Sequence, residues 1–191
     1  MDRIQVLVEE LTSGDDDRAE SAVHQLAKLG SQAIPALKSL LSSDQIDSRW
    51  WGVRALAEVN DPAVPPLIMN ALHDPDRRVR ECAAVGLRRQ PDPAAIPLLI
   101  ECIQKEEGEL SRLAADALVS IGAEAVPELI NVLKNGPQMS RLAAIRALAY
   151  IGDPRSIPAL FEALSQDSAL LEYWGNEGLD KMGVGMKFFK T

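Results

Sequence analysis

Aromatic and arginine side chains recur at matching places along this sequence, and their types are those best suited to bind another molecule. Trp50-Trp51 and Tyr173-Trp174 hold all three tryptophans of the chain and one of its two tyrosines. Aromatic residues and arginine are enriched at the centres of protein interfaces. We expect these side chains to anchor a partner and to pair with its acidic groups. The candidate binding residues are Trp50, Arg54, Arg88, Arg89, Arg112, Arg146, Tyr173 and Trp174.

The same residue types also have a purely structural interpretation. Neighbouring residues on a helix point about 100° apart, so within each aromatic pair one ring can pack in the core while the other faces solvent. We expect Trp50 and Tyr173 to be the exposed members. Three arginines can instead pair with an aspartate of the preceding turn, such as Asp47 or Asp76, and so join adjacent repeats. These arginines are Arg49, Arg80 and Arg141.

Residues that could perform catalysis or hold a metal are not arranged in any known motif. The sequence has no His-Glu-x-x-His, no phosphate-binding glycine loop, no nucleophile elbow and no Cys-x-x-Cys. Its two histidines, His24 and His73, are too few for a multi-histidine metal site. Cys82 and Cys102 stand among apolar neighbours and are interpreted as small core residues. We therefore expect no catalytic residue, no metal and no cofactor.

The elements that must position these residues repeat along the chain. Five segments begin with Ile-Pro or Val-Pro, spaced 30 to 32 residues apart, and apolar residues follow at helical spacing. Proline is tolerated in the first turn of a helix because its missing N–H would have no partner there. These segments predict the first helix of each hairpin. Their prolines are Pro35, Pro65, Pro97, Pro127 and Pro158.

A second series alternates with the first and predicts the second helix of each hairpin. Six leucines lie 30 or 31 residues apart, and four residues before each stands an alanine or a glycine. One helical turn separates the two residues, so both lie on one face, where the small residue lets a neighbouring helix approach. The leucines, here called the key leucines, are Leu26, Leu56, Leu87, Leu118, Leu148 and Leu179.

Two runs now carry a family resemblance. Residues 72–87, Leu-His-Asp-Pro-Asp-Arg-Arg-Val-Arg-Glu-Cys-Ala-Ala-Val-Gly-Leu, resemble the HEAT-like repeat first described in phycobilisome lyases, and residues 141–154 resemble it equally well. The resemblance covers roughly residues 15–183. It implies an all-α fold, a right-handed α-solenoid or α-α superhelix of about six HEAT-like hairpins, whose second helices line a concave face. It implies little about function, because such repeats occur in scaffolds, chaperones, lyases and DNA-repair proteins.

We expect a single repeat domain over residues 1–183, followed by an apolar tail at 184–191. The tail either folds back over the last hairpin as a lid or serves as a docking segment. The predicted hairpins cover residues 2–29, 33–59, 63–90, 94–121, 125–151 and 155–182.

Composition and charge narrow the classes of partner. Apolar residues make up 47% of the 191 residues but aromatics only 4%, which favours closely packed helices over a β-sandwich. A net charge of −8 argues against nucleic acid and anionic membrane as main partners. No apolar stretch is long enough to span a membrane, and the N-terminus has no signal core. We expect a cytoplasmic protein with reduced thiols.

Taken together, the sequence favours a non-catalytic scaffold or adaptor that binds another protein on its concave face, and not an enzyme. The alternative, which rests on the repeat type, is a phycobilin-lyase-like chaperone or isomerase, which would need an apolar groove large enough for a tetrapyrrole. A third interpretation is a HEAT-like DNA glycosylase, for which Trp50, Asp116 and Arg146 supply the residue types. The sequence pI of about 4.8 argues against it.

Overall fold

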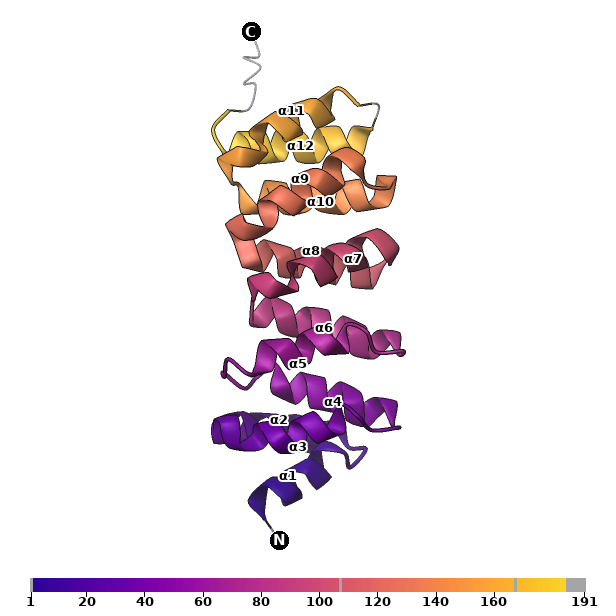
Figure 1. Cartoon of the computed structure of the whole chain (residues 1–191), viewed down its shortest axis with the longest axis vertical. Coiled ribbons are helices and arrows are strands. Elements are labelled where there is room, and N and C mark those ends of the chain that lie inside the picture. Colours follow the sequence, from indigo (N-terminus) through magenta and orange to yellow (C-terminus); the bar gives the residue numbers. More distant parts are fainter. Residues whose placement is uncertain (1, 107, 167, 185–191) are drawn as a thin grey trace. The chain divides into compact units, whose positions relative to one another are not determined.

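The computed structural model describes residues 2–106, 108–166 and 168–184, which form helices joined by short turns (Figure 1). These ranges contain twelve α-helices and four 3₁₀ helices, and no strand. The helices pack into two compact units, residues 1–92 and 93–191. The single domain expected from the sequence stays a prediction. Apart from Val184, the expected C-terminal tail lies outside the described residues.

Unit 1 contains three helical hairpins. The first helices are α1 (Arg3–Leu11), α3 (Ile34–Leu40) and α5 (Val64–Ala71). The second helices are α2 (Asp16–Leu29), α4 (Ile46–Leu56) and α6 (Arg77–Arg89). Each first helix packs against the second helix that follows it, and α4 also packs against both α2 and α6. The second helices thus form one continuous row within the unit.

Unit 2 repeats this arrangement. Its first helices are α7 (Ile96–Lys105), α9 (Val126–Asn135) and α11 (Ile157–Leu164). Its second helices are α8 (Glu109–Ile121), α10 (Gln138–Ile151) and α12 (Ala169–Lys181). The helix α10 packs against α8 on one side and α12 on the other. A second row of second helices results.

The proline series marks the starts of the first helices, as predicted. A proline stands at the first or second position of α3, α5, α7, α9 and α11. Short 3₁₀ helices lead into four of these five, at Gly30–Ala33, Pro93–Ala95, Gly122–Ala125 and Pro154–Ser156. Gly30 and Gly122 have φ angles of 59° and 82°, a left-handed conformation that is accessible to glycine at little cost.

The key leucines and their small partners form the core of both rows. All six leucines are at most 1% exposed, and the alanine or glycine four residues before each is buried too. The small size is needed: a Cβ on Gly175 would lie 2.7 Å from Leu164 Cδ2, and one on Gly52 would lie 3.0 Å from Leu40 Cβ. In these two hairpins the first helix therefore packs directly on the backbone of the second.

A second close approach joins neighbouring second helices. A Cβ on Gly86 of α6 would lie 3.3 Å from Ala57 Cβ at the end of α4, and one on Gly178 of α12 would lie 3.1 Å from Ala149 Cα on α10. Gly86 and Gly178 each stand one residue before the key leucine of their own helix. The alanines that they face, Ala57 and Ala149, each stand one residue after the key leucine of the preceding second helix. These contacts set the distance between neighbouring second helices within each row.

Gln90 connects the ends of α4 and α6. Its Nε2 donates to the carbonyl oxygens of Ala57 at 2.8 Å and Val59 at 2.9 Å, just beyond the end of α4. The last carbonyls of a helix have no partner within it, so this side chain satisfies groups that would otherwise need water. The third hairpin ends without a glycine, and Gln90 at its end is hydrogen-bonded to the end of the second hairpin.

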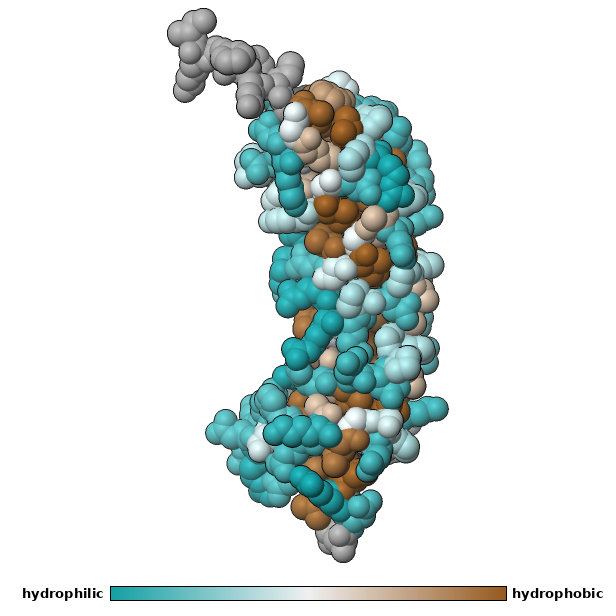
Figure 2. Space-filling view, turned by 90° about the vertical axis from the view of Figure 1, so that its left-hand side faces the viewer, coloured by the Kyte–Doolittle hydropathy of each residue, from teal (hydrophilic) through white to brown (hydrophobic). Residues whose placement is uncertain are grey.

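The outer surface is mainly polar. Figure 2 shows hydrophilic residues over most of one side of the molecule, with hydrophobic residues visible between them in groups. Within the described ranges, no helix combines the length and the apolar character that crossing a membrane requires.

Replacing Gly178 by leucine tests the close approach of α10 and α12. We expect Gly178→Leu to lower the free energy of unfolding by about 1–3 kcal/mol, because the side chain must displace Ala149 and Leu160. Urea unfolding followed by circular dichroism measures the change. Asn176→Leu adds the same side chain at an exposed site of α12 and should shift stability by no more than about 0.5 kcal/mol. Equal effects of the two variants would show that the glycine contact does not limit the packing.

Candidate functional site

The candidate binding residues all lie on the second helices, mostly on the sides that face away from the core. Positions two and six residues before a key leucine point away from the buried face, because each residue turns the helix by about 100°. Arg54 and Arg146 occupy the first of these positions, and Trp50, Arg112 and Tyr173 occupy the second.

In unit 1, two of the three arginines of the set form ion pairs. Arg54 on α4 donates through Nη2 to Glu20 on α2 and through Nη1 to Glu58 at 2.6 Å. Glu58 also pairs with Arg89 at the end of α6. One chain of charges thus runs across all three second helices. Arg54 and Arg89 have their charges compensated within the unit, while Arg88 is exposed and has no ion pair among the described residues.

Unit 2 contains an equivalent chain of charges. Arg112 on α8 donates to Glu109 through Nε at 3.0 Å and to Asp116 through Nη1 at 2.9 Å. Arg146 on α10 donates to the other oxygen of Asp116 at 3.0 Å. We expected these arginines to pair with acidic groups of a partner. Carboxylates of the chain itself already balance the charges of Arg54, Arg89, Arg112 and Arg146. A binding role for these residues stays a prediction.

The aromatic residues divide between the units. Trp50 and Trp51 in unit 1 meet edge to face with ring centroids 4.8 Å apart, and both are half-buried, although Trp50 was expected to be exposed. In unit 2, Tyr173 is 54% exposed and its ring lies 5.2 Å from that of Trp174, which is half-buried. The expectation of one exposed and one packed ring therefore describes the second pair only.

Sequence reasoning missed Tyr150, which completes the aromatic group of unit 2. Tyr150 is 52% exposed, and its ring centroid lies 5.5 Å from that of Trp174. A signal was present: Tyr150 stands two residues after the key leucine Leu148, a position that also points away from the core. Its neighbour in space is 24 residues away in the sequence, so only the packing of α10 on α12 brings the two rings together.

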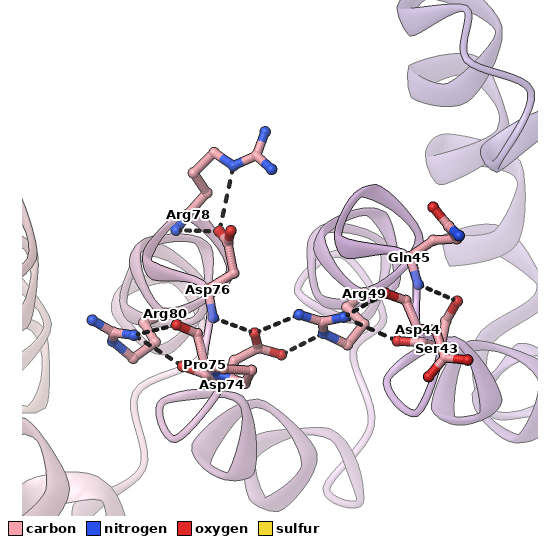
Figure 3. A network of polar contacts seen from close by, with 9 residues as sticks. All are labelled: Ser43, Asp44, Gln45, Arg49, Asp74, Pro75, Asp76, Arg78 and Arg80. Carbon is pink, nitrogen blue, oxygen red and sulfur yellow. Dashed lines mark hydrogen bonds and ion pairs between the residues drawn. The ribbon is translucent and has the colours of Figure 1, made fainter.

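A nearly buried ion pair joins the second and third hairpins (Figure 3). Arg49 donates to Asp74 through Nε at 2.7 Å and Nη2 at 2.9 Å, and the two side chains are only 12% and 9% exposed. Arg49 Nη1 also donates to the carbonyl of Ser43 at 3.0 Å. The expected partner in the preceding turn, Asp47, is wrong for Arg49: the carboxylate comes from the turn that precedes α6.

The other two arginines of this series bind main-chain carbonyls. Arg80 donates through Nη1 to the carbonyl oxygens of Asp74 at 2.9 Å and Pro75 at 3.1 Å, as Figure 3 shows. Arg141 donates through Nε to the carbonyl of Leu133 at 3.0 Å, near the end of α9. All three arginines therefore hold the connection between the two helices of their own hairpin. Asp76 instead caps α6 by accepting from the amide of Arg78.

Two opposing effects act on the carboxyl group of Asp74. Burial raises its pKa. The hydrogen bonds from Arg49 and from the amide of Asp76 lower the pKa, as do the charges of Arg49 and Arg80. These lowering effects outweigh burial and leave the pKa below its usual value. Asp74 is therefore ionised at neutral pH and pairs with a fully charged Arg49.

The cysteines offer no ready nucleophile. Burial raises the pKa of the Cys82 thiol to about 12, with its Sγ 3.9 Å from the carbonyl oxygen of Trp50. The thiolate is the reactive form of cysteine, so Cys82 is inert at neutral pH. Cys102 is buried as well, and both thiols are free. The interpretation of both as core residues agrees with their burial.

A cavity of about 240 Å³ lies beside the Arg49–Asp74 pair in unit 1. Its wall includes Leu41, Val53 and Leu67 together with the exposed Lys38. Pockets that enclose a drug-sized ligand measure about 300–1,000 Å³. This cavity is therefore too small to enclose a tetrapyrrole.

Helical hairpins whose second helices pack side by side define an α-solenoid, and comparison with known proteins gives the family. The chain belongs to the HEAT repeat family, which matches residues 4–88, 46–119, 65–138 and 103–180. The phycocyanin lyase complex of CpcE and CpcF from Nostoc sp. has the same fold, with a TM-score of 0.56 at 24% identity, over 96% of this chain and 78% of that one. The predicted fold class and repeat type are confirmed.

Curated relatives include subunits of bilin lyases. The phycocyanobilin lyase subunit beta of Nostoc sp. is 34% identical over 95 residues, which cover 50% of this chain and 46% of that protein. The bilin biosynthesis protein RpcF of Synechococcus sp. is 40% identical over 75 residues, 39% of this chain and 36% of that protein. The chain thus spans about half, or less, of the length of these relatives.

These relatives overturn our functional expectation. A non-catalytic scaffold that is not an enzyme was favoured because the chain contains no catalytic motif. Relatives that share the repeats are named as lyase subunits, and they favour the lyase-like alternative instead. The expectation rested on the absence of reactive-group motifs, and an absence of that kind does not exclude a part in an enzyme.

Asp74→Asn tests how much the ion pair beside the cavity stabilises the fold. We expect it to lower the free energy of unfolding by about 2–3 kcal/mol, because it leaves the guanidinium of Arg49 nearly buried without a counter-charge. Chemical denaturation at neutral pH measures the loss. The control is Glu109→Gln, which weakens a pair whose side chains are 45% and 50% exposed and should cost at most about 1 kcal/mol. Similar losses of unfolding free energy in both variants would show that the Arg49–Asp74 pair stabilises the fold no more than an exposed pair does.

The same pair predicts a dependence of stability on pH. The pKa of Asp74 is lower in the folded than in the unfolded chain, so its stabilising effect is complete above about pH 4 and is lost as the pH falls through the folded-state value. We therefore expect the stability difference between the wild type and Asp74→Asn to be constant from pH 7 to pH 5 and to shrink below about pH 4. Urea midpoints measured across this range check it. A difference that grows on acidification would have the wrong sign.

Proposed function

We propose that this chain is a subunit of a lyase-type enzyme that acts on a bilin, an open-chain tetrapyrrole. One observation carries the proposal: the identity of 34–40% that the repeats share with proteins named as a phycocyanobilin lyase subunit and a bilin biosynthesis protein. The likeness to the CpcE–CpcF complex supports the fold in which such an activity is found.

The chain contributes binding and orientation to this reaction. Joining a bilin to a protein requires a nucleophile that adds across a double bond, with its proton transferred to the neighbouring carbon. Cys82 and Cys102 are buried, and Cys82 is protonated at neutral pH, so neither thiol is suited to carry the bilin. The nucleophile is therefore supplied by the protein that accepts the bilin, and the lyase holds the two reactants in a productive orientation.

A second protein chain completes the enzyme in this proposal. The solved phycocyanin lyase of similar fold is a complex of CpcE and CpcF. We infer that the chain works with a partner subunit of the same repeat type. Phycocyanin, or a protein like it, is the proposed acceptor.

The proposal predicts covalent attachment of a bilin in a defined mixture. The purified chain, phycocyanobilin and the apo-form of the phycocyanin alpha subunit are combined, alone and with CpcE or CpcF of the Nostoc lyase added singly. We expect the chain to change the absorbance spectrum of the bilin, and at least one mixture to give a fluorescent adduct on a denaturing gel in the presence of zinc.

The control separates attachment by the enzyme from spontaneous addition. Mixtures that contain CpcE or CpcF without the chain set the background, and the adduct must exceed it. If the chain neither alters the bilin spectrum nor raises the adduct above this background, the proposed function is wrong.

A further inference from the structure

Large apolar side chains on α10 and α12 face solvent. Met139, Tyr150, Leu170 and Tyr173 are 66%, 52%, 57% and 54% exposed, and the half-buried Trp174 lies among them. These five residues are here called the aromatic strip. Four of the eight exposed large hydrophobic residues found in the described ranges belong to it. Single exposed apolar residues need no explanation, but a contiguous group marks a binding surface.

Register places the members of the strip side by side. Met139 and Leu170 each stand nine residues before the key leucine of their helix, a position that points away from the core. The packing of Gly178 against Ala149 aligns the two helices. The rings of Tyr150 and Tyr173 both contact that of Trp174, so the aromatic part is one continuous group.

The repeat itself does not require this surface. The matching positions of α8 hold Glu109 and Arg112, which pair with each other, and those of α6 hold Arg78 and Glu81, which pair with Asp76 and Arg77. Charged side chains serve these positions without loss of the fold. The apolar residues of α10 and α12 therefore reflect something other than helix packing.

Polar groups stand at defined places beside the strip. Lys181, at the end of α12, donates through Nζ to the carbonyl oxygen of Tyr150 and keeps two further N–H groups. Glu177 projects from α12 between Tyr173 and Lys181 in sequence, is exposed, and forms no ion pair with any described residue. A helix rises about 1.5 Å per residue, so Leu170 and Lys181 lie about 16 Å apart along α12. The strip thus offers aromatic faces, one cation and one free carboxylate along an extended line.

Resting on the function proposed above, we propose that the aromatic strip of unit 2 is where the bilin binds. A linear tetrapyrrole is a flat conjugated chain of four rings that carries two propionate carboxylates and several pyrrole N–H groups. Its rings stack on Tyr150, Tyr173 and Trp174, as flat conjugated groups do on aromatic side chains. Lys181 pairs with a propionate, and Glu177 accepts hydrogen bonds from pyrrole N–H groups.

The test measures binding of phycocyanobilin to the full chain by absorbance titration. The variant Tyr150→Ala/Tyr173→Ala removes two exposed rings, and we expect its affinity to fall by about tenfold or more, the factor that one or two lost aromatic contacts give. Phe161→Ala, which removes a ring that is 43% exposed on α11, should bind like the wild type. Thermal melts of both variants establish that the fold is intact.

The polar contacts are tested with matched variants and a modified ligand. Lys181→Met should weaken binding of phycocyanobilin but leave binding of its dimethyl ester unchanged, because the ester has no carboxylate to pair. Glu177→Gln should weaken binding of both ligands, whereas Glu172→Gln, another exposed carboxylate of α12, should weaken neither.

Each outcome separates this inference from the proposed function. If the wild type binds bilin and the double tyrosine variant binds it equally well, the strip is not the site, while the proposed function stands. If that variant keeps its affinity for bilin but no longer associates with CpcE or CpcF, the strip is a protein interface and the inference is wrong. If the wild type neither binds bilin nor promotes adduct formation, the proposed function fails first.

Discussion

On every second helix, a residue with little or no side chain lies one turn before a leucine that is almost completely buried, and the first helix packs directly on the exposed backbone there. A second contact of the same kind, between glycine and alanine, sets the distance between neighbouring second helices at Gly86 and Gly178. Together these contacts determine which faces of the second helices are buried and which residues remain outside. The positions available for binding follow from this packing.

The outward positions are used in two ways. Across unit 1 and across α8 and α10, carboxylates and guanidinium groups neutralise one another in chains such as Glu20–Arg54–Glu58–Arg89. Exposed pairs of this kind contribute little to stability, about 0–1 kcal/mol each, but they compensate the charges of the four residues in this chain of charges. On α10 and α12, outward positions beside these charges hold the exposed apolar or aromatic residues Met139, Tyr150, Leu170 and Tyr173. The molecule thus has charged and aromatic surfaces built on one repeat.

This arrangement explains how a protein without a catalytic motif can belong to a lyase. Its thiols are buried, and charged groups such as Arg49, Arg54 and Arg146 are paired with carboxylates. Under the proposed function, the chain supplies a surface that holds a flat molecule in place while the acceptor protein supplies the reactive group. That role does not require a reactive-group motif, and the absence of one led sequence reasoning to a scaffold.

The sequence by itself determined the hairpins, because the proline series, the key leucines and their small neighbours act through contacts within one helix or between adjacent helices. It also identified Tyr173 and Trp174, which a local pattern reveals. Only the tertiary structure decided the partners: Asp74 rather than Asp47 for Arg49, Glu20 for Arg54, and Trp174 for Tyr150. These residues lie 24 to 34 positions apart, and side chains at such distances meet only where two repeats pack. A repeat pattern predicts which faces meet, but the choice among several charged or aromatic neighbours on those faces depends on geometry that packing alone sets.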